Sequence, residues 1–326
     1  MALGIQLPLL PTTTTGSFPK TAELIEMRYK VSQGVLPPTE LVRKERIATE
    51  IWLREQSRVG LNVFVDGEME RGNPIGYFAE KIEGFEKGSR IRLEGNRYYR
   101  KPVIRGKITW KGSLIQESWQ MTQRATHSPL KAVLTGPYSL MDFSFNEFYS
   151  SREDLLVDLT VIYKKEITSL IEAGVKIIQI DEPSLTSHPE DLTLIADLYK
   201  ELTKNQRPYF ILHHAYGDPA PLWSKIQKFP LDNFSFEAAN SEMSILQSLK
   251  KYPTEKDVTL GLIDANIERV ETSREISDRV KAALKAVPLQ QLWFSTDSGL
   301  KSLKTETAVE KMNILVKTVS KIRAEK

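Results

Sequence analysis

The chain has 326 residues, of which 40% are hydrophobic and 27% are charged, a balance typical of a globular protein. Its 45 lysines and arginines against 42 aspartates and glutamates leave a net charge of +3, too close to neutral to indicate a nucleic-acid-binding surface. The absence of cysteine excludes disulfides, a thiolate nucleophile and zinc held by cysteine.

The sequence predicts no membrane span, because no run approaches ~18 apolar residues. The opening MALGIQLPLLPTTTT has no basic stretch ahead of its apolar residues and no clear cleavage site, so it does not resemble a signal peptide. We therefore expect a cytoplasmic protein.

Eight β-rich apolar runs alternate with segments of helical spacing, such as 153–174 and 273–287. The runs lie at residues 12–15, 61–66, 131–135, 176–181, 208–214, 233–237, 258–263 and 291–296. A run such as KIIQI is apolar on both faces, as expected of a buried parallel strand. Eight such units favour an α/β fold of the (β/α)₈ barrel type, with residues 1–326 as one domain.

The region 85–112 interrupts this alternation after the second predicted strand. It is basic, aromatic and β-rich, and it predicts an inserted β-hairpin. Insertions at the ends of barrel strands commonly help to build the active-site face, but a purely structural hairpin is an equal alternative.

Polar side chains gather at the predicted carboxyl ends of the strands, where a (β/α)₈ barrel carries its chemistry. Taken singly, each has a structural alternative, because an acid after a strand often caps a helix and a strand histidine often lies in the core. Together they predict a site at one rim. They include Ser17, Glu68, Asp181, His213, His214, Glu237, Asn266 and Asp297.

Several strings at these strand ends are similar to those of the cobalamin-independent methionine synthase family. They are GEMER at 67–71, LTGP at 134–137, IQIDEP at 178–183 and DSGLK at 297–301, within a resemblance that covers nearly the whole chain. The resemblance implies the catalytic barrel of that family. It also implies transfer of a methyl group from a methyltetrahydrofolate-type donor to homocysteine.

The resemblance further assigns ligand contacts to individual positions. It places Ser17, Glu68 and Asp181 against the amino acid backbone of homocysteine, where carboxylates suit an α-ammonium group. The positions that it places against the folate are Arg97, Lys101 and Phe143.

The zinc of the family is held by His, Cys, Glu and Cys, and half of that set is missing here. His213 and Glu237 match the first and third ligands, whereas Ala215 and Ser298 stand at the cysteine positions. Neither alanine nor a neutral serine replaces a thiolate on zinc. Asn266 stands where the family has a catalytic histidine, so Asp181 and Asn266 occupy the catalytic positions.

Three functions remain open without the sulfur ligands. The chain is a zinc-poor methyl-transfer subunit or paralogue that works with a zinc-bearing paralogous barrel or as a homo-oligomer. Alternatively, it binds another metal through His213, His214, Glu237 and Asp297, or it is a non-catalytic partner barrel that binds homocysteine, methionine or folate. The sequence favours the first, with small molecules as its ligands.

Overall fold

The computed structural model describes residues 4–92 and 98–326. Its main sheet is parallel and has the strand order β3-β5-β6-β7-β8-β9. The six strands are β3 (Ala132–Thr135), β5 (Ile177–Asp181), β6 (Tyr209–His214), β7 (Asn233–Phe236), β8 (Asp257–Ile263) and β9 (Leu292–Thr296).

The first two predicted strand runs close this sheet into a barrel. Thr12 forms a parallel bridge with Phe294 of β9, and Phe64 forms one with Leu130, just before β3. The Thr12 carbonyl accepts the backbone N–H groups of residues 62 and 63, at 3.0 and 3.2 Å. The predicted (β/α)₈ barrel is therefore confirmed, although residues 12–15 and 61–66 contribute isolated bridges in place of long ladders.

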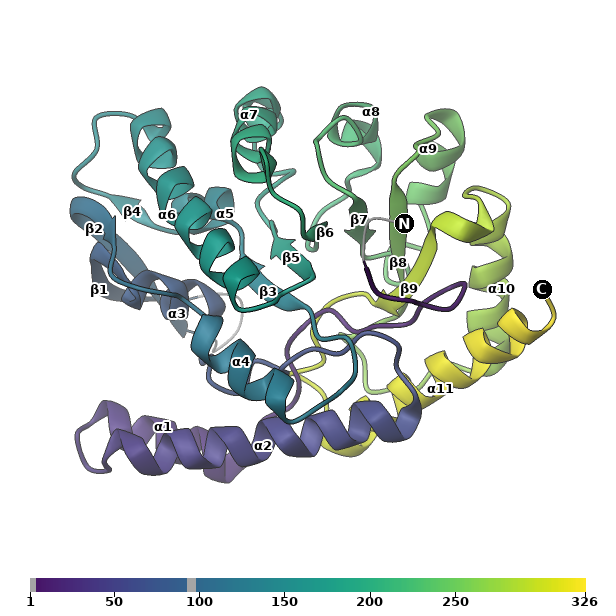
Figure 1. Ribbon diagram of the computed structural model, residues 1–326, viewed down its shortest axis with the longest axis horizontal. Coiled ribbons are helices and arrows are strands. Elements are labelled where there is room, and N and C mark those ends of the chain that lie inside the picture. Colours follow the sequence, from purple (N-terminus) through teal and green to yellow (C-terminus); the bar gives the residue numbers. More distant parts are fainter. Residues whose placement is uncertain (1–3, 93–97) are drawn as a thin grey trace.

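Helices surround the barrel, as Figure 1 shows. The predicted helical segments at 153–174 and 273–287 correspond to α6 and α10, which begin at capping residues Ser151 and Thr272. No helix in residues 4–92 and 98–326 combines the length and apolar character that crossing a membrane needs. The α-helices are α1 (Ala22–Ser32), α2 (Pro38–Val59), α3 (Pro74–Glu80), α4 (Gln116–Arg124), α5 (Pro137–Asp142), α6 (Arg152–Glu172), α7 (Leu192–Thr203), α8 (Trp223–Ile226), α9 (Ile245–Lys251), α10 (Ser273–Leu284) and α11 (Thr305–Ala324).

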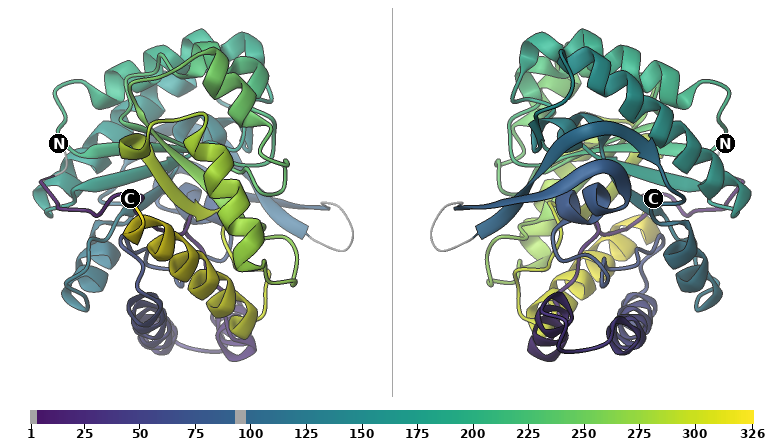
Figure 2. Two further views of the ribbon diagram at one scale, coloured as in Figure 1. Left: turned by 90° about the vertical axis from the view of Figure 1, so that its right-hand side faces the viewer. Right: turned by 90° about the vertical axis from the view of Figure 1, so that its left-hand side faces the viewer.

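Two further strands, β1 (Ile82–Arg92) and β2 (Tyr98–Trp110), pair antiparallel in the region predicted as an insertion. They project from the body of the barrel (Figure 2). β2 also pairs in parallel with β4 (Phe145–Asn146), the short strand that follows α5. This small sheet joins the projecting strands to the segment after β3.

Helix α2 holds the ends of the first two barrel runs in place. The Trp52 ring stacks on Phe18 at 4.4 Å between centroids, and its Nε1 donates to the Pro19 carbonyl at 3.2 Å. Gln56 donates to the carbonyl and accepts from the N–H of Val65, both at 2.9 Å. These buried contacts position the loops that carry Ser17 and Glu68.

A fully buried ion pair fastens the loop after β8 to α11. Lys311 Nζ donates to Glu271 Oε2 at 2.9 Å and to the carbonyls of Asp264 and Arg269 at 3.0 and 2.6 Å. Both side chains of the pair have no exposed surface. All three donors of the ammonium group are therefore used.

Replacing Lys311 with methionine leaves the Glu271 charge buried without its partner. We expect Lys311→Met to lower the free energy of unfolding by about 3–5 kcal/mol, measured by urea denaturation. The exposed Lys317 of the same helix is the matched control, and Lys317→Met should change stability by less than about 0.5 kcal/mol. Equal losses in the two variants would show that the ion pair does not fasten the loop.

Candidate functional site

The loops after the first, second and eighth barrel strands are tied together. The Phe18 N–H donates to the Gly67 carbonyl at 3.0 Å, and the Ser17 carbonyl accepts from the Leu300 N–H at 2.7 Å. A Cβ on Gly299 would lie 2.1 Å from Ser17 Oγ, so only glycine allows this approach. Ser17 is thus held at the rim, as predicted.

The turn at Gly67 and Glu68 has left-handed backbone geometry, with φ of 73° and 57°. A glutamate rarely adopts this conformation, and such strain gathers at functional sites. The Glu68 N–H donates to Asp66 Oδ1 at 2.9 Å, which supports the turn. The buried Glu68 carboxylate lies against Gly16, where a Cβ would come within 2.8 Å of Oε1.

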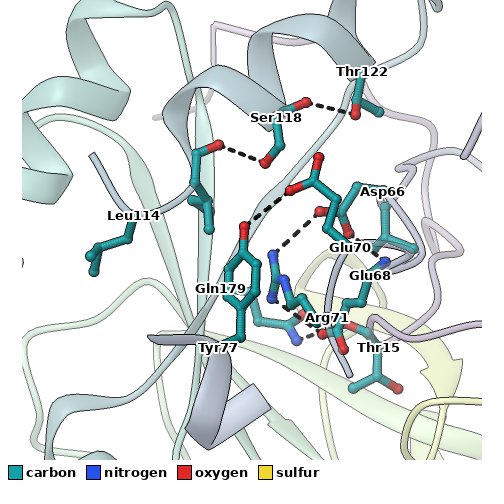
Figure 3. Close-up of polar contacts among 12 residues, drawn as sticks. Thr15, Asp66, Glu68, Glu70, Arg71, Tyr77, Leu114, Ser118, Thr122 and Gln179 are labelled. Carbon is teal, nitrogen blue, oxygen red and sulfur yellow. Dashed lines mark hydrogen bonds and ion pairs between the residues drawn. The ribbon is translucent and has the colours of Figure 1, made fainter. Parts of the chain in front are cut away.

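A buried arginine joins the acids of this segment. Arg71 donates to Asp66 at 3.3 Å and to Glu68 at 3.4 Å, as Figure 3 shows. Its guanidinium also lies over the rings of Tyr77 and Phe78, at 5.6 and 5.4 Å. Burial opposes the charge, but the two carboxylates outweigh it and raise the pKa of Arg71. The sequence analysis did not single out Arg71, although it is the last residue of GEMER.

Asp181 lies half-buried at the end of β5 and takes part in a buried polar chain. Lys131 Nζ donates to Gln179 Oε1 at 2.6 Å, and Gln179 Nε2 donates to Asp181 Oδ1 at 2.7 Å and to the Thr15 carbonyl at 2.8 Å. Burial, with a further contribution from the Glu68 charge, raises the pKa of Asp181 to about 7. Burial lowers the pKa of Lys131 to about 7.

The two adjacent histidines of β6 have different partners. His213 Nδ1 lies 3.0 Å from Ser235 Oγ, whereas His214 Nδ1 bonds to the Glu182 carbonyl at 2.9 Å and its Nε2 lies 3.3 Å from Thr186 Oγ1. Burial, with smaller contributions from the charges of Lys131 and His214, lowers the pKa of His213 to about 3. The His213 ring is therefore neutral at pH 7.

Two acids directly follow β7 and β9, and hydrogen bonds hold both of them. Asp297 accepts N–H bonds from Ala238 and Ala239 at 2.9 Å and from Asn240 at 2.7 Å. Burial raises the pKa of Asp297 to about 7, although the three hydrogen bonds lower it. The charge of Glu237 raises it further. Glu237 Oε2 accepts from Asn240 Nδ2 at 3.0 Å, whereas its buried Oε1 has no partner among the described residues.

A model of the catalytic domain of cobalamin-independent synthases matches residues 10–321 of the chain. The chain belongs to the cobalamin-independent methionine synthase family. Methionine synthases of Saccharolobus solfataricus and Thermococcus kodakarensis are 32% and 33% identical to it, over 98% of this chain and 97% and 96% of theirs.

Solved structures agree with this family assignment. A B12-independent methionine synthase from Shewanella sp. W3-18-1, in complex with selenomethionine, superposes with a TM-score of 0.86 at 25% identity. The superposition covers 97% of this chain and 98% of that one. A Listeria monocytogenes structure described as a putative B12-independent methionine synthase shares the fold, with a TM-score of 0.80 at 22% identity over 98% and 99% of the chains.

The four positions that the family resemblance assigns to zinc are all buried. They are His213, Glu237 and the two cysteine positions, Ala215 and Ser298. Within the described residues, no group of three or more His, Cys, Asp or Glu side chains is arranged to hold a metal. His214 bonds to the Glu182 carbonyl and Asp297 to the Ala238 N–H, so the described residues do not bring His213, His214, Glu237 and Asp297 together as such a group, and a metal there stays a prediction.

The remaining predicted positions lie apart from the buried acids. Asn266 is exposed after β8, and its N–H donates to Asp264 Oδ1 at 2.8 Å. Lys101 of β2 places its Nζ 4.2 Å from the centre of the Phe145 ring, and Phe143 is half-buried at the end of α5. Arg97 lies outside the described residues. The ligand contacts of these four positions stay predictions.

We expect purified protein dialysed against a chelator to contain no stoichiometric zinc by elemental analysis, because two protein ligands fall short of the three or four of known zinc sites. The double variant Ala215→Cys/Ser298→Cys restores the His, Cys, Glu and Cys set and should retain about one zinc per chain. Each single variant, with three ligands, is the control and should bind more weakly. Wild-type protein that keeps one zinc through dialysis would contradict this account.

Proposed function

We propose that this chain is a methionine-synthase-type methyltransferase barrel that binds homocysteine and methionine but does not ionise the thiol with a zinc of its own. The observation that carries the proposal is that Glu68 and Asp181 both lie against the end of the first run, Glu68 Oε1 beside Gly16 and Asp181 linked through Gln179 to the Thr15 carbonyl. The two acids come from different strand ends, and the charge of Glu68 raises the pKa of Asp181. An α-ammonium group between them relieves this repulsion and supplies hydrogen-bond donors to both.

The carboxylate of the amino acid is assigned to Ser17 and Lys20. Lys20 is half-buried and makes no hydrogen bond or ion pair with any residue that the structure describes. Burial lowers the pKa of Lys20 to about 8, although the nearby charge of Glu68 acts in the opposite direction. An anionic group beside Lys20 would stabilise the charged form of this lysine against burial. The selenomethionine complex of the Shewanella relative supports an amino acid of this shape as the ligand.

The methyl donor is assigned to the side of the barrel that carries β2 and α5. We infer a methyltetrahydrofolate-type donor, with Phe143 against its pterin ring and the basic residues Lys101 and Arg97 near its anionic tail. In the transfer, the bond between the methyl carbon and the donor breaks and a bond from that carbon to sulfur forms. The thiol proton must leave for this to occur.

Loss of that proton is the step that this chain supports least. A free thiol with a pKa of about 8.5 is mostly protonated at pH 7, and the thiolate is the nucleophile. Since Ala215 and Ser298 offer no sulfur ligand, we infer that turnover needs a zinc-bearing paralogous barrel. The second candidate function is a non-catalytic barrel that binds homocysteine, methionine or folate for such a partner.

Neutralising either acid should weaken methionine binding. We expect Glu68→Gln and Asp181→Asn each to raise the Kd by roughly 10–100-fold in calorimetry, as expected for loss of a charge-assisted hydrogen bond. The des-amino analogue 4-(methylthio)butanoate, which lacks the ammonium group, should change by less than about twofold. Glu70→Gln is the matched control, because Glu70 accepts from the Tyr77 hydroxyl and lies in the same segment. Equal losses for both ligands would count against the proposal.

Methionine binding should depend on pH around neutrality. The pKa of Asp181 is raised to about 7, and the ammonium group favours its ionised form, so binding releases a proton. The Kd should therefore rise as the pH falls below 7, by up to about tenfold per pH unit. Calorimetry in buffers of different ionisation enthalpy measures the released proton directly. If the dependence persists unchanged in Asp181→Asn, another group is responsible.

A further inference from the structure

A buried lysine lies beneath the candidate amino acid site and contacts neither of its acids. Lys131 precedes β3, and its ammonium group is bonded to one side chain among the described residues, the neutral amide of Gln179. Both side chains are almost fully buried. Burying an ammonium group against a neutral partner costs stability, so packing alone does not account for a lysine at this position.

The hydrogen bonds of Gln179 indicate that Lys131 helps to determine the orientation of the Gln179 amide. A glutamine amide has one acceptor end and one donor end of nearly the same shape, whereas a lysine ammonium only donates. Lys131 therefore holds the Gln179 oxygen toward itself and turns the nitrogen toward Asp181 and Thr15. The two N–H bonds of that nitrogen go to Asp181 Oδ1 at 2.7 Å and the Thr15 carbonyl at 2.8 Å.

The strand geometry places these groups on one path toward the rim. Gln179 and Asp181 are two residues apart on β5, so their side chains lie on the same face. The Thr15 carbonyl belongs to the run that leads to Ser17. Gln179 thus ties Asp181 to the end of the first barrel run, which does not pair with β5, and occupies only Oδ1; no described residue bonds to Oδ2.

We propose that Lys131 is a positioning residue for the amino acid site, which acts through Gln179 to orient Asp181 and to leave Oδ2 for the ligand ammonium. The inference rests on the proposed function. Without Lys131, the buried Gln179 oxygen has no donor among the described residues, so the amide that donates to Asp181 and to Thr15 is held less firmly.

The test compares Lys131→Met, Gln179→Leu and the double variant, with calorimetric Kd values for methionine and for 4-(methylthio)butanoate. Each single variant should weaken methionine binding about tenfold and leave the analogue within about twofold. Because Lys131 acts through Gln179, the double variant should lose no more than Gln179→Leu alone. Additive losses, or equal losses for the two ligands, would overturn the proposal.

Two further variants separate positioning from stability. Lys311→Met also removes a buried lysine, but one bonded to the loop after β8, and it should leave both Kd values unchanged while it stays folded. Gln179→Glu gives Lys131 a direct ionic partner and should fold, but its carboxylate has no donor for Asp181, so methionine binding should fall about tenfold. Unchanged binding in Gln179→Glu would overturn the proposal. Wild-type protein that binds no methionine would instead refute the proposed function.

Discussion

The candidate site depends on how charges are enclosed inside a closed barrel. An ionised side chain inside such a structure needs a partner, because burial strongly disfavours an uncompensated charge. Arg71 is the partner of Asp66 and Glu68. Gln179 accepts from Lys131 and donates to Asp181 and to the end of the first run. These bonds link segments that are far apart in the sequence. The acids to which the proposed function assigns the ligand are consequently held by protein groups alone.

The other half of the rim carries the positions that the family resemblance assigns to zinc. Beside them, Asp297 receives three backbone N–H groups from the turn after β7, and Glu237 accepts from Asn240. Ala215 and Ser298 are the only changes among the four zinc positions that the family resemblance identifies. In the proposed function, amino acid binding and thiol activation are separable, because the first is assigned to the ends of strands one, two and four and the second to those of strands five, six and eight.

The sequence predicted the barrel well because most strands are short apolar runs separated by helical segments, and burial of both faces produces such runs. It also predicted that Ser17, Glu68 and Asp181 lie at strand ends, where the structure has them, whereas their roles stay predictions. It did not predict Lys131, Gln179 or Asn240, whose roles depend on hydrogen bonds between segments distant in the chain. One local signal was present, since Gln179 lies two residues before Asp181 and therefore shares its face of β5. Nothing local indicated that Lys131 would meet that amide.

A crystal structure of the chain grown with homocysteine and zinc tests the central claim most directly. The account predicts the ligand ammonium group between Glu68 and Asp181, its carboxylate near Ser17 and Lys20, and no metal beside His213. A zinc ion coordinated by His213, Glu237 and the homocysteine sulfur would contradict it, because this barrel would then activate the thiol without cysteine ligands.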